Sequence, residues 1–203
     1  MMAKVTQAHV DARRADILNA ASELFSSKGW QDTSMQEVAA AAGLSTGAIY
    51  RYYPSKDDLL RAIFEDATGT MRQTFAEEGA LATSPLDAIL RVGRRILSSE
   101  ECHDPSMFLE SALAMKVDPE EWAPRRRAFA LDTLIQIEEL VVQGQAAGQI
   151  DPGLDPKTTS QILYALVPGL AALWMEQGDQ PDIDAVMDTV GAMLSAGREG
   201  GVP

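Results

Sequence analysis

The chain has 203 residues, of which 46% are hydrophobic and 23% charged, the balance of a globular protein with a sizeable core. The single cysteine, Cys102, excludes an intramolecular disulfide, and no apolar run reaches the roughly 18 residues of a membrane-spanning helix. The start of the chain has no apolar segment of the kind found in signal peptides. We therefore expect a cytoplasmic protein that does not associate with membranes.

The first element predicted is a helix from about residue 9 to Gly29. Residues 1–8 show no helical pattern and are expected to be disordered. Apolar residues then recur at three- and four-residue steps and place one stripe on a helix: Ile17, Ala20, Ala21, Leu24 and Phe25. Gly29 ends the pattern. Arg13 and Arg14, near the start of this helix, would contact phosphates or simply form a solvated face.

Two short helices joined by a tight turn are predicted between Ser34 and Lys56. Ser34 and Glu37 have the spacing of a capping box at the start of the first helix. Gly43 is suited to the left-handed conformation that ends it. Ser45 is a candidate cap for the second helix, which we expect from Thr46 to about residue 52, ahead of Pro54.

The spacing of three residues favours packing of these two helices as a helix-turn-helix. Ala39 is small where the helices would cross, Gly43 lies at the turn, and Ile49 would point back under the first helix. An ordinary helical hairpin in an all-α core is the alternative. If the unit reads DNA, the residues expected to contact it are Thr33, Ser45, Thr46, Gly47, Tyr50, Arg51, Tyr52 and Lys56. Lys56 would meet a phosphate.

This part of the sequence resembles the N-terminal domain of TetR-family transcriptional regulators. The resemblance runs from about Val10 to Ala67, and residues 17–65 that carry it read ILNAASELFSSKGWQDTSMQEVAAAAGLSTGAIYRYYPSKDDLLRAIFE. The run GAIYRYYPSKDDLL is its most specific part. Over the rest of the chain the likeness is one of size and helical character. The resemblance implies a DNA-reading domain, a helical effector-binding domain, and an effector that alters the spacing of two DNA-reading domains.

The distribution of charge reconciles an acidic chain with DNA binding. The net charge is −13, but residues 1–60 hold six basic and seven acidic residues, so the acidity belongs to the rest of the chain. A local basic patch could form from Arg13, Arg14, Lys28, Arg51 and Lys56. We expect modest non-specific affinity and reliance on specific contacts.

Helices account for the rest of the chain, so the predicted fold is all-α. A long helix from about residue 56 to 78 would join the DNA-binding domain, residues 9–55, to an effector-binding and dimerisation domain, residues 56–198. Prolines after polar residues mark helix starts and predict helices at about 84–99, 105–117, 119–148, 156–178 and 181–197. Pro124 is expected to separate a turn at 119–122 from the main helix. Residues 199–203 are expected to be disordered.

Two helices near the C-terminus suggest a dimer. Residues 162–175 are apolar on almost all sides, and residues 183–194 carry a clean apolar stripe. Either the helices complete a monomer core or they form a four-helix seam with a second subunit, as a two-fold reader of a palindromic site would need. The residues assigned to this interface are Ile162, Leu166, Leu170, Trp174, Ile183, Val186, Met187, Val190, Met193 and Leu194.

An effector pocket is expected among large, soft side chains of the second half. The candidates are Met107, Phe108, Glu110, Met115, Trp122, Phe129, Tyr164 and Trp174. Each of them could equally be a core residue, and Glu110, which would favour a cationic effector, could face solvent. The cluster Arg125–Arg127 could instead bind an anionic effector, although a solvated helix face explains it as well.

No catalytic or cofactor motif is recognisable. Cys102 and His103 are adjacent but lack the geometry and the further ligands of a metal or nucleophilic site, so no cofactor, metal or enzymatic activity is expected. The sequence predicts a DNA-binding transcriptional regulator, a homodimeric repressor released by a small apolar or amphipathic effector. The alternative is a helix-turn-helix protein without such an effector, either constitutive or controlled by a protein partner.

Overall fold

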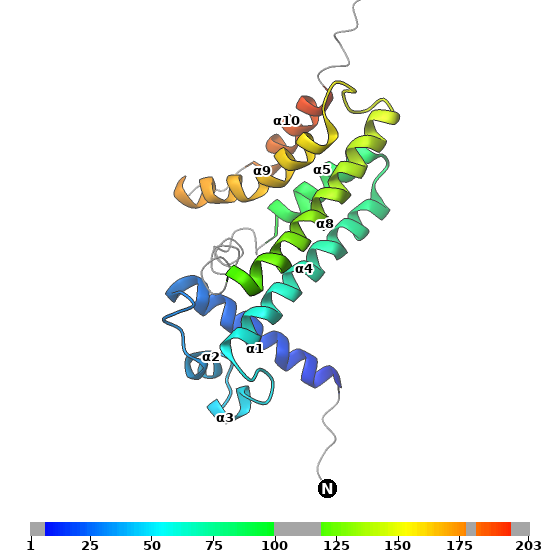
Figure 1. The fold of residues 1–203 in the computed structure, drawn as a ribbon. Coiled ribbons are helices and arrows are strands. Elements are labelled where there is room, and N and C mark those ends of the chain that lie inside the picture. The colour runs from blue at the N-terminus through cyan, green and yellow to red at the C-terminus, as the bar shows by residue number, and fades with distance from the viewer. Residues whose placement is uncertain (1–6, 100–118, 178–181, 196–203) are drawn as a thin grey trace, which may run out of the picture. The chain divides into compact units, whose positions relative to one another are not determined.

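The computed structural model describes residues 7–99, 119–177 and 182–195 (Figure 1). These residues form helices and connecting turns, without a strand. With the labels of Figure 1, the helices are α1 Gln7–Lys28, α2 Met35–Ala41, α3 Thr46–Ile49, α4 Lys56–Leu81, α5 Pro85–Leu97, α8 Pro119–Ala146, α9 Pro156–Gln177 and α10 Ile183–Ser195. None of these helices has the length and apolar character needed to cross a bilayer.

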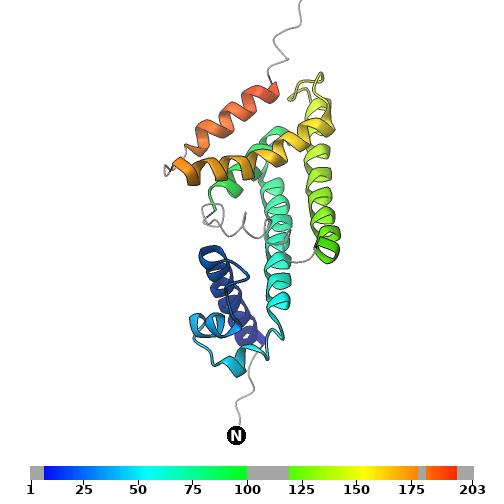
Figure 2. The ribbon, with the colours of Figure 1, turned by 60° about the vertical axis from the view of Figure 1, so that its left-hand side comes forward.

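The described residues divide into two compact units, whose boundary lies inside α4 between Gly69 and Thr70. The first unit holds α1, α2, α3 and the first half of α4 (Figure 2). Its core is made of buried apolar side chains: Ile17, Ala21, Phe25, Val38, Ala39, Ile49, Leu59, Leu60 and Ile63. Ile17, Ala21 and Phe25 belong to the stripe predicted for the first helix. Trp30 closes one end of this core, with its ring packed edge-on against Phe25 at 5.3 Å between centroids.

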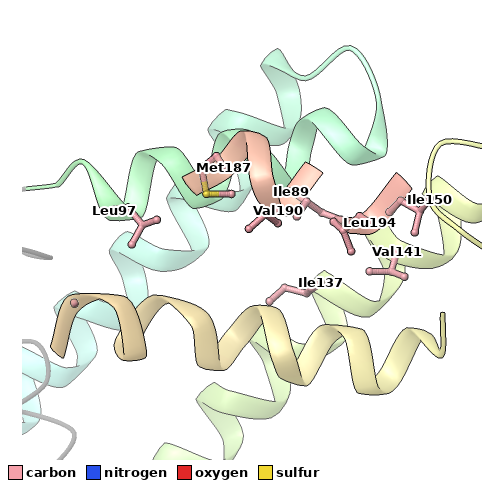
Figure 3. Packing of buried hydrophobic residues seen from close by; sticks show 9 residues of the cluster. Ile89, Leu97, Ile137, Val141, Ile150, Met187, Val190 and Leu194 are labelled. Atoms are coloured by element: carbon pink, nitrogen blue, oxygen red, sulfur yellow. The ribbon is translucent and has the colours of Figure 1, made fainter. Parts of the chain in front are cut away.

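The second unit is a helical bundle in which α8 packs against α9 and α5 contacts α8, α9 and α10. Its buried cluster, shown in Figure 3, draws residues from each of these helices and from the α8–α9 connection: Ile89, Leu97, Ile137, Val141, Ile150, Ala171, Met187, Val190 and Leu194. Helix α10 supplies three of these residues, so its buried face packs within its own chain.

Close packing and ion pairs fasten α10 to α5. Gly93 faces the end of the Met187 side chain, and a Cβ added there would lie 2.6 Å from Met187 Cε. Arg94 on α5 donates from Nε to Asp184 at 3.0 Å and from Nη2 to Asp188 at 2.9 Å. The close approach at Gly93 and the two ion pairs of Arg94 therefore hold the last helix against its own chain.

Most predicted helix starts are confirmed, with two corrections. Ser84 caps α5, and Pro85 occupies its first turn. The expected break before Pro124 is wrong, since α8 runs continuously from Pro119. Pro124 lies near the start of the helix, where the backbone hydrogen bond that it cannot donate is lost without ending the helix. Helix α10 begins at Ile183, because Asp182 accepts the Ala185 N–H as its cap. The helix expected at 105–117 lies outside the described residues.

Candidate nucleic-acid interface

Helix α2 begins with the predicted capping box. The Glu37 N–H donates to Ser34 Oγ at 3.3 Å, and the Ser34 N–H donates to Glu37 Oε2 at 2.8 Å. Lys28, at the end of α1, donates to the other Glu37 oxygen. The hydrogen bond from Lys28, followed by those from Ser34, lowers the pKa of Glu37 to about 2. One carboxylate therefore both caps α2 and ties it to α1.

The turn between α2 and α3 has the geometry that its residues predict. Gly43 has φ 67°, a conformation that costs glycine little, and the Leu44 N–H donates to the Ala39 carbonyl at 2.7 Å. Ala39 and Ile49 are both buried, so the two helices pack through them as expected. Helix α3 ends at Ile49 rather than near residue 52, and the chain continues as a turn.

The outer face of α3 and the following turn is open to solvent. Ser45, Thr46, Gly47, Tyr50 and Arg51 are exposed, whereas the Tyr52 side chain is half-buried. Ser45 begins α3 without a side-chain capping bond, so its hydroxyl is not used in that cap. Hydroxyl groups, a phenol, a guanidinium and bare backbone at Gly47 are the donors, acceptors and close approach that reading base edges requires.

Tyr53, the residue directly after this face, is anchored by burial and by a cation–π contact. Tyr53 is buried, and the Arg14 guanidinium lies 5.5 Å from the centre of its ring. Burial raises the pKa of Tyr53, with the Arg14 charge acting in the opposite direction. In the sequence Arg14 is a candidate phosphate contact. In the structure its guanidinium helps to anchor Tyr53, which follows the exposed face.

Thr33 differs from its predicted role as a DNA contact. It is 2% exposed, and its Oγ1 donates to the Gly29 carbonyl at 2.8 Å and lies 3.3 Å from the Leu24 carbonyl. Its hydroxyl thus satisfies carbonyls at the end of α1. Thr33 was predicted as a DNA contact because it lies next to the start of a helix. Its position in the sequence does not indicate whether its side chain is buried.

Lys56 also differs from its predicted role as a free phosphate contact. Its Nζ donates to the carbonyls of Trp30 at 2.6 Å and Thr33 at 2.9 Å, and it lies 3.4 Å from the Gln31 carbonyl. The ammonium also lies 4.5 Å from the centre of the Trp30 ring. Desolvation lowers the pKa of Lys56, and Asp57 and Asp32 oppose this effect. The ammonium is turned into the protein.

The proposed basic patch is accordingly weaker than the charges suggest. Arg13 pairs with Asp16 at 3.2 Å, and Lys28 pairs with Glu37. With Lys56 turned inward, Arg51 is the exposed cation on the face formed by α3 and the turn after it. Hydrogen bonding, more than a broad positive field, is what this face offers.

Comparison with known proteins identifies this unit. Residues 17–63 match the family described as "Bacterial regulatory proteins, tetR family". The chain belongs to the TetR family. This family consists of DNA-binding transcriptional regulators, so the protein is a DNA-binding transcriptional regulator and not an enzyme.

Similarity to TetR-family proteins extends over nearly the whole chain. A "Fatty acid metabolism regulator protein" from Bacillus subtilis (strain 168) is 22% identical over 89% of this chain and 93% of its own length. An "HTH-type transcriptional repressor Rv1474c" from Mycobacterium tuberculosis is 26% identical over 93% of this chain and 96% of its own.

Solved structures share the all-α TetR fold across both units. The fatty acid degradation regulator FadR from Bacillus halodurans aligns with a TM-score of 0.76 at 19% identity, covering 94% of this chain and 96% of that one. FadR from Bacillus subtilis, in complex with stearoyl-CoA, aligns with a TM-score of 0.74 at 20% identity, covering 90% of this chain and 98% of that one.

The residues predicted to line an effector pocket in this TetR-family protein are only partly described. Met107, Phe108, Glu110 and Met115 lie outside the described residues, and of Trp122 the structure describes only the place in α8. Phe129, Tyr164 and Trp174 are half-buried in the second unit. Tyr164 and Trp174 pack against its hydrophobic cluster, and burial raises the pKa of Tyr164.

The residues assigned to a dimer interface fall into three groups. Met187, Val190 and Leu194 are buried in the chain's own core against α5, so their assignment to a subunit interface needs correction. A second group is half-buried against the same cluster: Leu166, Leu170, Trp174, Ile183 and Val186. Ile162 on α9 and Met193 on α10 are exposed.

The exposed apolar residues on α8 were not predicted from the sequence. Leu131, Ile135 and Val142 are exposed there, and on α9 Leu173 is exposed together with Ile162. The separations of four and seven residues on α8, and of eleven on α9, keep each set on one helix face. This spacing is visible in the sequence and could have revealed these residues.

Proposed function

We propose that this TetR-family protein is a homodimeric repressor that binds a palindromic operator and is released by an amphipathic small molecule. The observation that carries the proposal is the exposed face of α3 and the turn after it, where Ser45, Thr46, Tyr50 and Arg51 reach solvent from a buried support. A unit this small can contact only a few base pairs, so a specific site needs two copies related by a two-fold axis.

Helices α8 and α9 are the proposed dimer surface. They pack against each other, and both carry exposed apolar side chains: Leu131, Ile135 and Val142 on α8, and Ile162 and Leu173 on α9. Two such helices from each subunit would make a four-helix seam. The apolar stripe of α10 is buried within its own chain and is not part of the proposed seam. Of the apolar residues of α10 assigned to the interface, Met193 is exposed and could still contact the second subunit.

A fatty acyl-CoA is the proposed effector class to test first. The chain is similar over nearly its whole length to a fatty acid metabolism regulator, and a solved structure of the same fold contains stearoyl-CoA. The half-buried rings of Phe129, Tyr164 and Trp174 in the second unit are suited to an acyl chain. An apolar tail with a charged head also fits the amphipathic ligand that the sequence predicts.

Selection of bound DNA from a random pool tests the operator. We expect a sequence with two-fold symmetry. Replacing Arg51 by alanine should weaken binding by about 10- to 100-fold, the loss of a good base or phosphate contact. Arg95→Ala, which removes an equal charge from an exposed position on α5 in the second unit, is the matched control. Equal losses for the two variants, or no selected sequence, would argue against the proposed reading face.

Thermal shift and operator release test the effector. Stearoyl-CoA at 100 times its dissociation constant would stabilise the folded protein by about 2.7 kcal/mol, whereas coenzyme A without the acyl chain should do so far less. The same ligand should lower operator affinity. If acyl-CoAs with chains of different length leave both the melting temperature and operator binding unchanged, a regulator without this effector is the better account.

A further inference from the structure

One ammonium group joins the two ends of the helix-turn-helix. The segment that contains α2 and α3 lies between Thr33 and Lys56, and the Lys56 Nζ donates to the Thr33 carbonyl at 2.9 Å. The same nitrogen donates to the Trp30 carbonyl at 2.6 Å and lies over the Trp30 ring. The Lys56 side chain thus links the end of the segment that contains α2 and α3 to the turn at residues 30–33, which precedes that segment.

We propose that Lys56 is a positioning residue for DNA reading, which fixes α3 by holding the turn at residues 30–33, and that its charge is not a phosphate contact. This inference rests on the proposed function of α3 and deepens it. It assigns the first residue of α4 to the support of the reading face rather than to the face itself.

The turn that Lys56 holds is attached to α1 from the opposite side. Thr33 Oγ1 donates to the Gly29 carbonyl at the end of α1, and the Trp30 ring packs on Phe25. Because Lys56 is the first residue of α4, its ammonium brings the end of α1, the approach to α2 and the start of α4 to one point. Arg51 precedes Lys56 by only five residues, so movement of the α4 start would move the exposed face.

The chemistry at this point requires a lysine. An ammonium has three N–H donors on a single atom and can direct them at converging carbonyls, whereas a guanidinium spreads its donors over a planar fork. Three carbonyl oxygens, those of Trp30, Gln31 and Thr33, lie within 3.4 Å of Nζ. Moving the ammonium to a phosphate would take the Lys56 donor from the part-buried Thr33 carbonyl and would leave the Trp30 carbonyl only the Thr33 N–H, at 3.4 Å.

The charges around Lys56 also disfavour a phosphate. Asp57 and Asp58 occupy the first turn of α4, and Asp32 lies in the turn that Lys56 holds. Asp58 is used locally, since its N–H donates to Ser55 Oγ and its carboxylate accepts from Arg61. A phosphate approaching this helix end would therefore meet carboxylates next to an ammonium whose donors are already used.

The test compares Lys56→Met, Lys56→Arg and Arg51→Met in the full-length protein. Affinity for the selected operator is measured over a range of salt concentrations, at a temperature where circular dichroism shows every variant to be folded. We expect both Lys56 variants to lower the melting temperature and to weaken operator binding about tenfold or more, without changing the slope of log affinity against log salt. Arg51→Met should weaken binding with no loss of melting temperature.

Two results would overturn the proposal. If Lys56 binds a phosphate, Lys56→Arg will retain affinity, and Lys56→Met will reduce the salt slope by about 1.8 for a dimer, about 0.9 for each phosphate contact. If Lys56 serves stability alone, folded Lys56→Met will bind the operator as the wild type does. Failure of the wild-type protein to bind any DNA would instead refute the function on which the inference rests.

Discussion

Replacing Ile162 by aspartate should dissociate the proposed dimer without unfolding the subunit. Ile162 is 62% exposed on α9, so its substitution removes little from the core of the second unit. Complete burial of such a side chain contributes about 1.5–3 kcal/mol, and the exposed fraction corresponds to about 1–2 kcal/mol. With two copies in a symmetric interface, loss of the apolar contact alone amounts to about 2–4 kcal/mol. This is equivalent to a dissociation constant raised by about 30- to 1,000-fold.

Two carboxylates placed in an apolar seam add a desolvation cost, so the upper end of this range is the better expectation. Sedimentation velocity over a series of protein concentrations measures the dissociation constant, and circular dichroism verifies the fold. The matched control is Leu81→Asp, because Leu81 is 63% exposed at the end of α4, outside the proposed surface. Operator affinity should fall with Ile162→Asp and persist with Leu81→Asp.

The reasoning would be refuted if Ile162→Asp and Leu81→Asp had the same dissociation constant as the wild type, or the same raised value. The first result would leave the exposed apolar rows of α8 and α9 without a role in association. The second would mean that added charge, wherever it is placed, weakens the dimer.

The remaining predictions concern stability and pH. Met187→Ala should destabilise the second unit by about 2–5 kcal/mol in denaturant titration, because Met187 is buried against α5; a loss below 1 kcal/mol would place it at the surface. Glu37, whose pKa falls from 4.5 to about 2 in the folded state, should contribute stability that is fully present above about pH 4.5 and is lost as the pH falls toward 2. Melting of Glu37→Gln should be less sensitive to pH across this window, and identical profiles would contradict the assignment. Gly144→Ala should lower the melting temperature, because the added Cβ would lie 2.6 Å from Ile150 Cδ1 and 2.8 Å from its Cγ1. Gly79→Ala, with nothing within 4 Å of its Cβ, should raise the melting temperature by gaining about 1 kcal/mol of helix propensity.

Short-range features were predictable because their causes are local. The capping box of Ser34 and Glu37, the left-handed Gly43 and the start of α5 after Ser84 all depend on residues within four positions of one another. Their geometry follows from backbone chemistry that any chain with these residues would share. The apolar stripes of the helices were predictable for the same reason, since period alone decides which side chains share a face.

Only the tertiary structure shows which surfaces the apolar helix faces pack against and which acceptors the polar side chains bind. The stripe of Met187, Val190 and Leu194 is evident in the sequence, but a period does not say whether the helix covering it comes from the same chain. The Lys56 ammonium finds its acceptors up to 26 residues away, in the turn at residues 30–33, and no local pattern links the two positions. The sequence by itself determined a helix-turn-helix on an all-α body. Packing determined which of the predicted contact residues use their polar groups inside the unit, because Thr33 is buried and the Lys56 ammonium makes long-range hydrogen bonds.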